Sequence, residues 1–429
     1  MAGYLENNRD RRMRLVQHNI ISSKAVLAVI LLISAGAQDG RWHWGTMANP
    51  KIAAAIRQET SADAIYAGYQ IVKRLAAPNA PLGGGRRPFP GFIFEDNQGR
   101  FWIAHVSGGA QVQLYDDRTG QWDTFSSKQS DSEGLHHHGD ALLPSNIAHI
   151  CQARDGTMWF SDSQFSQHML AAWKDRLFLT SFNGKQWRSF PFAPTSNGSI
   201  GLVQGIDGRV WLWVMDQMSY WDQDRWSEPL RISDVLKDPA PKIPPILAGT
   251  PEAQAIQKRY LTRYEIISAM EDQEGYIWVS THNGVLTYRP RTNEFRRFPD
   301  LRDVRARAIY EDHKGRIWFN EFDIATMYDR SDGAVTRYAP LDHIIIQPNA
   351  PNGPAIISGI CQDRRGRMMF ASAQGLIILN EIDKRWSFAP ANLLGLDAEH
   401  VKDELESIME DSKGRIWLPG FTGIAILAQ

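Results

Sequence analysis

Residues 308–320 read A-I-Y-E-D-H-K-G-R-I-W-F-N, and this stretch decides the fold because degenerate copies of it return along the chain. Two short apolar runs flank an acidic segment that ends at Gly315. Ile309 and Tyr310 lead into the turn, and a run ending in Trp318 and Phe319 leads out of it. Apolar runs joined by a short turn of this composition predict a β-hairpin.

Six further copies can be aligned on the tryptophan, and in one of them methionine replaces it. They are centred on Trp102, Trp159, Trp211, Trp278, Met369 and Trp417. With Trp318 included, the intervals are 57, 52, 67, 40, 51 and 48 residues, so 40 residues is the unit and the excess is inserted loop. Each unit continues with a third and a fourth short strand, such as 285–288 and 295–298. A strand-built period of this length predicts propeller blades.

The repeats therefore predict an all-β fold, a single seven-bladed β-propeller of four-stranded antiparallel blades over residues 69–429. The last unit ends after its third strand, 423–427, and has no fourth. Residues 69–75, Y-Q-I-V-K-R-L, precede the first blade and have a strand-like pattern. We expect this strand to pair with 423–427 and close the ring, because that pairing removes two exposed sheet edges.

The amino-terminal region differs from the repeats. Residues 1–37 combine a charged lead with the apolar run 25–33 and then small residues, which is typical of a secretory signal peptide; an uncleaved anchor is the alternative. Residues 38–68 predict a short helical adaptor. Helices are expected only within 48–67 and 250–261, where Thr250 and Pro251 favour a helix start. We expect no other transmembrane span, and a periplasmic or secreted protein.

Composition argues against several classes of function. The 47 basic and 48 acidic residues nearly balance, so nucleic acid is not an expected partner. Cys151 and Cys361 fall in blades too far apart for a disulfide, so both are expected to be buried free thiols. The three adjacent histidines at 136–138 cannot converge on one ion. We therefore expect no metal and no cofactor.

Polar residues gather at one end of the predicted ring. The long inserts, 126–145, 227–262 and 340–355, connect successive blades, and such connections lie at the same end as the turn between second and third strands. Loops on a rigid scaffold commonly carry function. The structural alternative is that these residues only keep the rim soluble. The candidate ligand-binding residues at this end are His105, Asn146, Asp162, Glu265, His282, Arg305, Glu321 and Glu404.

The pattern I-x-E-D-x-x-G-R-I-W, followed by an apolar strand, resembles the two-component regulator propeller repeat. The likeness spans residues 69–429 and is best in 269–288, 308–328 and 408–427. It implies the periplasmic sensor region of a signal-transduction system, although no kinase follows in this chain. We expect an exported, non-catalytic propeller whose partner is a small-molecule or glycan ligand, or a membrane sensor protein.

A weaker likeness is to the streptogramin B lyase propellers, whose repeats contain W-F-T-E. Here W-F-N-E at 318–321 is similar to it. This likeness implies an alternative function, a lyase or hydrolase in which His282 and Glu321 form an acid–base pair. A third possibility is a structural interaction scaffold without a ligand.

Overall fold

The computed structural model describes residues 68–76, 89–106, 111–126, 137–138, 141–142, 147–162, 177–192, 200–222, 225–238, 250–321, 323–340, 356–372, 374–391, 394, 405, 407–420 and 423–429. The chain divides into two compact units, residues 1–61 and 62–429, and every described residue belongs to the second. The expected signal peptide and the expected helix within 48–67 lie outside the described residues.

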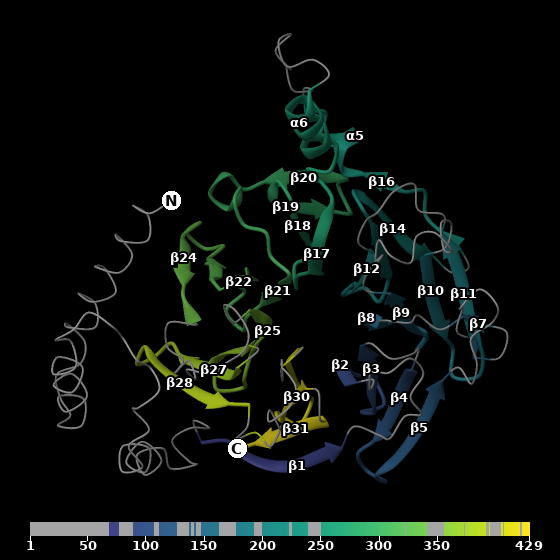
Figure 1. Cartoon of the computed structure of the whole chain (residues 1–429), viewed down its shortest axis with the longest axis vertical. Coiled ribbons are helices and arrows are strands. Elements are labelled where there is room, and N and C mark those ends of the chain that lie inside the picture. Colours follow the sequence, from purple (N-terminus) through teal and green to yellow (C-terminus); the bar gives the residue numbers. More distant parts are fainter. Residues whose placement is uncertain are drawn as a thin grey trace, which may run out of the picture. The chain divides into compact units, whose positions relative to one another are not determined.

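The described residues form seven antiparallel sheets, the blades of a propeller (Figure 1). Numbered in chain order, blade 1 is β2 to β5, blade 2 is β8 to β11, blade 3 is β12 to β15, blade 4 is β17 to β20, blade 5 is β21 to β24, blade 6 is β25 to β28, and blade 7 is β29 to β31 with β1. In blade 3, β16 also pairs with β14, and β6 with β7 forms a separate ribbon. The predicted seven-bladed fold is confirmed.

The strands have the following bounds. Blade 1 contains β2 (Phe89–Glu95), β3 (Phe101–Val106), β4 (Gln111–Asp116) and β5 (Gln121–Ser126). Blade 2 contains β8 (Ile147–Gln152), β9 (Met158–Asp162), β10 (Leu177–Phe182) and β11 (Trp187–Phe192). Blade 3 contains β12 (Ile200–Gln204), β13 (Val210–Val214), β14 (Gln217–Asp222) and β15 (Arg225–Trp226), with β16 (Leu230–Arg231) beside β14. Blade 4 contains β17 (Ile266–Glu271), β18 (Ile277–Thr281), β19 (Gly284–Arg289) and β20 (Glu294–Arg297). Blade 5 contains β21 (Ala308–Glu311), β22 (Ile317–Asn320), β23 (Ala325–Tyr328) and β24 (Val335–Tyr338). Blade 6 contains β25 (Ile357–Gln362), β26 (Met368–Ser372), β27 (Gly375–Asn380) and β28 (Arg385–Pro390). Blade 7 contains β29 (Met409–Glu410), β30 (Ile416–Gly420), β31 (Gly423–Ala428) and β1 (Gln70–Ala76). The separate ribbon consists of β6 (His137–His138) and β7 (Ala141–Leu142).

The first turn of most blades is built around a buried aspartate. Asp312 Oδ1 accepts hydrogen bonds from the backbone N–H groups of Lys314 (2.9 Å) and Arg316 (3.0 Å). Its Oδ2 accepts from Trp318 Nε1 (2.8 Å) and Arg316 Nε (2.7 Å). The motif aspartate, arginine and tryptophan therefore form one local network that fixes the hairpin. The amide and tryptophan contacts recur around Asp96, Asp272 and Asp411.

Blades 2 and 6 each lack one member of this network. In blade 2, Ala153 stands at the aspartate position, and Trp159 Nε1 is buried without a hydrogen-bond partner among the described residues. In blade 6, Met369 stands at the tryptophan position. There the Tyr69 hydroxyl, which comes from the segment before blade 1, donates to Asp363 Oδ2 at 2.9 Å in place of the indole.

In six of the seven blades, the residue before the motif aspartate position accepts a hydrogen bond from the blade before it. Glu311 Oε2 accepts a hydrogen bond from the backbone N–H of Gln273 in blade 4 (2.8 Å), and Gln362 Oε1 accepts from His313 in blade 5 (2.7 Å). The same link joins Glu95 to Ser412, Gln152 to Asn97, Glu271 to Ile206, and Glu410 to Arg364. Six of the seven blades are thus connected through the sequence motif itself.

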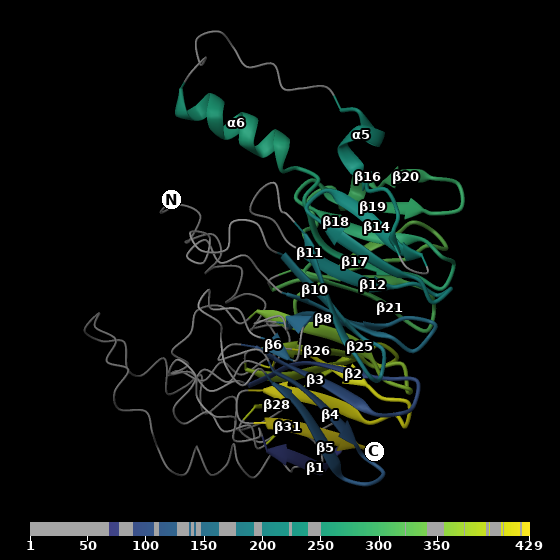
Figure 2. The same cartoon turned by 90° about the vertical axis from the view of Figure 1, so that its right-hand side faces the viewer.

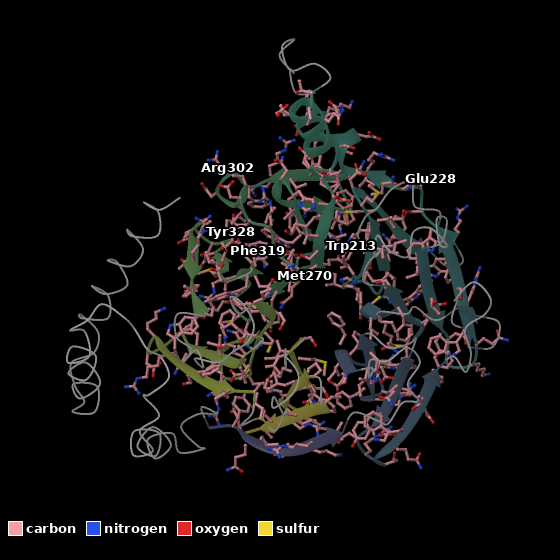
Figure 3. All side chains as sticks on the ribbon, in the orientation of Figure 1. Trp213, Glu228, Met270, Arg302, Phe319 and Tyr328 are labelled. Carbon is pink, nitrogen blue, oxygen red and sulfur yellow. The ribbon has the colours of Figure 1, made fainter. Side chains whose placement is uncertain are left out.

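Apolar side chains fill the spaces between blades. Phe319 of blade 5 is fully buried in a cluster with Trp278 of blade 4, and Met270 and Tyr328 pack against it (Figure 3). Trp318 packs against Met368, Phe370 and other residues of blade 6. The repeated tryptophans therefore serve blade-to-blade packing, as their equivalent positions predict.

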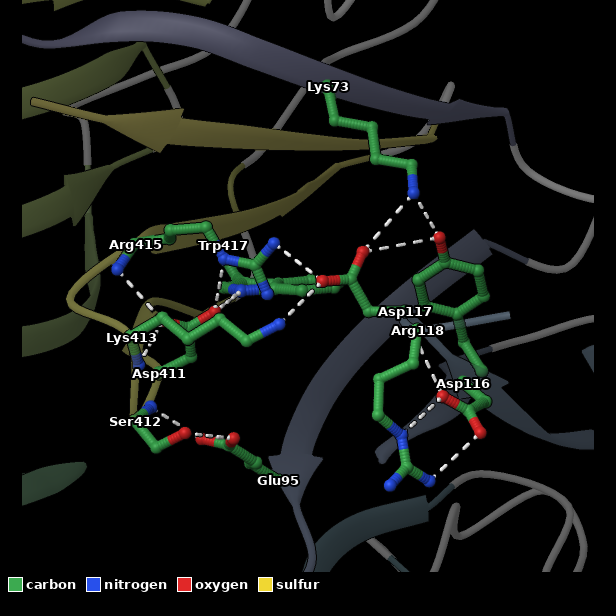
Figure 4. A network of polar contacts seen from close by, with 11 residues as sticks. Lys73, Glu95, Asp116, Asp117, Arg118, Asp411, Ser412, Lys413, Arg415 and Trp417 are labelled. Atoms are coloured by element: carbon green, nitrogen blue, oxygen red, sulfur yellow. Dashed lines mark hydrogen bonds and ion pairs between the residues drawn. The ribbon is translucent and has the colours of Figure 1, made fainter. Parts of the chain in front are cut away.

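The ring is closed by β1, which pairs antiparallel with β31, from Gln70 opposite Ala428 to Ala76 opposite Gly423. Side chains add to this pairing where blade 7 meets blade 1. Asp117 of blade 1 contacts Lys73 of β1 (3.2 Å) and, from blade 7, Lys413 (3.1 Å) and Arg415 (2.7 Å) (Figure 4). One carboxylate is therefore shared by three cations at the closing seam.

Two helices occur among the described residues, α5 (Ile232–Leu236) and α6 (Pro251–Leu261), together with the short 3-10 helix η3 (Pro299–Leu301). Thr250 Oγ1 accepts a hydrogen bond from the Ala253 backbone N–H at 3.2 Å, so α6 begins as its capping residue predicts. Helix α5 was not expected from the sequence. Figure 2 shows the blades from the side, with both helices. No helix in the described part of the chain is long and apolar enough to cross a membrane.

Candidate ligand-binding site

Three of the predicted residues meet where blades 4 and 5 adjoin, at the end of the propeller that carries the inserts, called here the insert end. Glu265 precedes β17, His282 lies in the turn between β18 and β19, and Arg305 precedes β21. Glu265 Oε2 lies 3.7 Å from His282 Nε2, and Arg305 Nε donates a hydrogen bond to the His282 carbonyl at 3.1 Å.

The local backbone explains why these segments approach so closely. Thr281 Oγ1 donates to the Gly284 carbonyl (2.8 Å) and accepts from the Asn283 N–H (3.1 Å), which fixes the turn that carries His282. Gly284 has φ +91°, and a Cβ on it would lie 2.5 Å from the Cα of Arg302. Only glycine allows the lead-in to blade 5 to pack against this turn.

The electrostatics of this cluster follow from partial burial. Burial and the nearby Arg305 lower the pKa of His282, so its imidazole is neutral at pH 7. The Glu265 side chain is only 14% exposed, whereas the His282 side chain is 51% exposed. The cluster thus offers a carboxylate, a neutral imidazole that can donate or accept, and an exposed guanidinium.

Glu321 lies in the turn after β22 of blade 5 and has a different partner. Its Oε1 accepts a hydrogen bond from Thr326 Oγ1 at 2.9 Å, and its N–H donates to the Ile324 carbonyl at 2.8 Å. Among the contacts of the described residues, no hydrogen bond or ion pair joins Glu321 to His282. The carboxylate that faces His282 is Glu265.

His105 lies inside blade 1 and is only 1% exposed. Its Nε2 is 2.7 Å from Gln113 Oε1 on the next strand, and Gln113 Nε2 donates to Thr124 Oγ1 at 3.3 Å. Burial lowers the pKa of His105 to about 4, so the ring is neutral. The side chain therefore belongs to a polar chain within the sheet.

The side chains of the three remaining predicted residues are not among those that the structure describes. Asn146 and Glu404 lie outside the described residues. Asp162 is the last residue of β9, but its side chain is not among those described.

Two carboxylates that fasten the insert after β16 were not predicted to do so. Asp216 Oδ2 accepts from Ser233 Oγ at 2.7 Å, and its carbonyl accepts from the Ile232 N–H at 2.9 Å, which holds the start of α5. Asp238 contacts the Tyr264 hydroxyl and the Arg297 guanidinium. Asp238 and Arg297 are 59 residues apart in the sequence, so no local sequence pattern predicts their contact.

Other possible sites are few among the described residues. No group of three or more His, Cys, Asp or Glu residues there could hold a metal ion. Both cysteines are buried free thiols, as expected. One shallow cavity of about 430 Å³ is lined by Asp300, Gly333, Val335 and Arg337, none of which was a predicted site residue.

Comparison with known proteins supports the fold. No protein-family model matches the chain, and neither does any curated protein. Among solved structures it is similar to a streptogramin B lyase, with 12% identity and a TM-score of 0.55 over 84% of this chain and 97% of that chain. The virginiamycin B lyase from Staphylococcus aureus gives 13% identity and 0.54 over 84% of this chain and 99% of that chain.

A third similar structure is the extracellular domain of BT4673 from B. thetaiotaomicron, described as belonging to a one component or a hybrid two component system. Identity is 14% and the TM-score is 0.51 over 83% of this chain, but the matched part is only 40% of that domain. The sensor domain and the lyase are both seven-bladed propellers. At these identities the likeness shows the fold alone, which is the fold that both sequence resemblances implied.

Proposed function

We propose that this chain is an exported propeller that binds a small polar ligand, such as a metabolite or glycan, or a segment of a sensor protein at the insert end of blades 4 and 5. The observation that carries the proposal is the cluster of Glu265, His282 and Arg305. Arg305 is exposed, and its guanidinium is anchored through Nε alone among the described contacts. Its terminal nitrogens can therefore bind a carboxylate or phosphate in a bidentate manner.

The neighbouring groups favour a ligand with mixed polarity. A neutral imidazole accepts from a hydroxyl or donates to a carbonyl, and the Glu265 carboxylate accepts from a hydroxyl or an amine. An acid bearing hydroxyl or amino groups matches all three. Periplasmic or secreted location belongs to the same proposal, since the amino-terminal segment reads as a signal peptide and the fold is shared with an extracellular sensor domain.

Substitution of the cluster tests the proposal. Arg305→Ala and His282→Ala are each expected to remove the ligand-induced rise in unfolding temperature in a screen of metabolites and glycans. The unfolding temperature without ligand should hardly change, because Arg305 is exposed and the His282 side chain is half exposed.

The matched control is Lys314→Ala, at the opposite end of blade 5. Asp312 and Asp411 are unsuitable as controls, because both are buried and fix their turns. Loss of ligand binding in Lys314→Ala but not in Arg305→Ala would contradict the proposal.

The same variants separate the alternative functions. Turnover of a bound compound that disappears in both His282→Ala and Glu321→Ala would favour a lyase or hydrolase, for which the lyase-like fold is the supporting observation. Failure of every ligand, combined with capture of a membrane sensor protein by the intact insert end, would favour the protein partner instead.

A further inference from the structure

A cavity of about 430 Å³ lies between blades 4 and 5, where their last strands, β20 and β24, stand at the rim of the ring (Figure 1). Val335 and Arg337 line it from β24, and they share a face of that strand because they are two residues apart. Gly333, just before β24, lines it as well, and Asp300 of η3 lines it from blade 4. A cavity of this size accommodates a small organic molecule.

Two opposite charges line this cavity without partners. Asp300 and Arg337 are exposed, and neither side chain makes a hydrogen bond or ion pair with any residue that the structure describes, including each other. A carboxylate and a guanidinium that face one cavity but do not pair can each bind a group of a ligand.

Other charged groups near the cavity have partners already. Arg302 pairs with Asp303 (3.6 Å), and the Arg296 guanidinium lies over the Phe298 ring, 5.0 Å from its centroid. In the turn before β24, two aspartates accept hydrogen bonds from backbone N–H groups: Asp329 from Ser331 (2.9 Å) and Asp332 from Ala334 (2.8 Å). Asp300 and Arg337 are therefore the lining charges that remain for a ligand.

The cavity also has an apolar wall. Val335 is partly buried against a cluster that contains Phe298 and Leu301 of blade 4. Leu301 is fully buried, which anchors η3 and with it the position of Asp300. The cavity thus combines an acid, a base and an apolar surface.

We propose that this cavity binds an α-amino acid with an apolar side chain, at a site that shares no residue with the cluster of Glu265, His282 and Arg305. The ligand ammonium donates to the Asp300 carboxylate, and the ligand carboxylate accepts from the Arg337 guanidinium. The apolar side chain of the ligand covers Val335.

Ligands with a single kind of charge match this cavity less well. An anion such as phosphate pairs with Arg337 but is repelled by Asp300, and a simple cation meets the reverse situation. A neutral sugar leaves both protein charges without a counter-charge. Only a zwitterion neutralises both at once.

The test measures binding to the full chain near neutral pH by isothermal titration calorimetry, with three ligands that share one carbon skeleton. Leucine carries both charges, leucinamide lacks the carboxylate, and 4-methylpentanoate lacks the ammonium. Leucine should bind most tightly, and loss of either charged group should weaken binding by roughly tenfold.

Two single variants assign each charge to its partner. Arg337→Gln should weaken binding of leucine and 4-methylpentanoate by roughly tenfold but leave leucinamide unaffected. Asp300→Asn should weaken binding of leucine and leucinamide but leave 4-methylpentanoate unaffected. Because both side chains are exposed, the unfolding temperature should hardly change in either variant.

The matched controls are Asp383→Asn and Arg385→Gln in blade 6, an exposed acid and base that pair with each other at 3.6 Å. Both controls should bind all three ligands like the unaltered chain. Arg305→Ala should also leave leucine binding unchanged, so failure of the ligand site at the insert end would not affect this result.

Four outcomes would overturn the proposal. They are absence of leucine binding at millimolar concentration, equal affinity for the three ligands, equal weakening in the blade 6 controls, and loss of leucine binding in Arg305→Ala but not in Arg337→Gln. The last outcome would assign the amino acid to the insert end instead.

Discussion

Asp312 shows what the buried aspartate of the turn motif contributes to stability. It is fully buried, yet both of its oxygens accept hydrogen bonds from the turn backbone, Arg316 and Trp318. Since a buried carboxylate without partners is costly, the aspartate is stabilising only as part of the complete set. Each part of the motif therefore depends on the others.

This dependence predicts unequal costs for the same substitution in two blades. Trp318→Phe removes an indole that donates to Asp312, whereas Trp159→Phe removes an indole whose Nε1 has no hydrogen-bond partner among the described residues. We expect Trp318→Phe to lower the free energy of unfolding by about 2 kcal/mol more than Trp159→Phe, measured by urea denaturation. Equal losses would show that the indole hydrogen bond contributes nothing net.

Glu271 predicts a pH dependence at the seam between blades 3 and 4. Burial, then the neighbouring Asp207, raises its pKa from 4.5 to about 7, and its Oε2 is buried without a hydrogen-bond partner in the described part of the chain. Between these values the folded state holds the proton more tightly than the unfolded state, so the free energy of unfolding falls as pH rises from about 4.5 to about 7.

Glu271→Gln should remove this fall, and glutamine already stands at the equivalent positions 152, 204 and 362. We expect the variant to be more stable than the unaltered chain at pH 8 by roughly 1 kcal/mol, a value discounted because the group is only half-buried. The comparison is Glu311→Gln: burial raises the pKa of this carboxyl too, but its carboxylate also contacts Arg330, so this variant should gain less stability at pH 8 than Glu271→Gln. Stability curves of identical shape for Glu271→Gln and the unaltered chain would contradict this account.

Strand β1 is the element on which closure of the ring depends. It supplies the fourth strand of blade 7 and the lysine that reaches Asp117 of blade 1, and Tyr69 directly before it supplies the hydroxyl that takes the place of the indole in blade 6. One segment therefore contacts three blades.

Two truncations isolate this contribution. A chain that begins at residue 68 should unfold at nearly the same temperature as the full chain, whereas one that begins at residue 77 should unfold at a clearly lower temperature and self-associate. The reason is that removal of β1 exposes the edge of β31. Calorimetry and size-exclusion chromatography measure the two effects, and equal behaviour of both truncations would show that β1 is dispensable.

The whole propeller differs from an open repeat protein because a ring has no terminal repeat to fray. Motif side chains link six of the blades to their predecessors, so we expect tryptophan fluorescence and far-UV circular dichroism to report one coincident unfolding transition. A separate early transition would instead identify blades 2 and 3, which lack the motif aspartate, as a unit that melts alone.

The architecture could be predicted from sequence because its signals are local. Asp312 and Trp318 are six residues apart and bond to each other, so the repeat is visible as a pattern of letters. The candidate site is not local, since Glu265, His282 and Arg305 come from three segments whose meeting depends on Gly284. His105 was predicted together with His282 as a residue that follows the tryptophan strand, but it lies within β3, where Gln113 on the next strand is its buried partner.

The pairing of β1 with β31 also sets an order of events during synthesis. β1 is among the first strands of the propeller to leave the ribosome, and its partner β31 is the last, about 350 residues later when counted from Ala76 to Gly423. At 5–20 residues per second, roughly 20 to 70 seconds separate the two. Throughout that interval the nascent ring is an open arc with an unpaired strand at one end, so its most aggregation-prone state precedes completion of the chain, and delay or interruption of translation prolongs it.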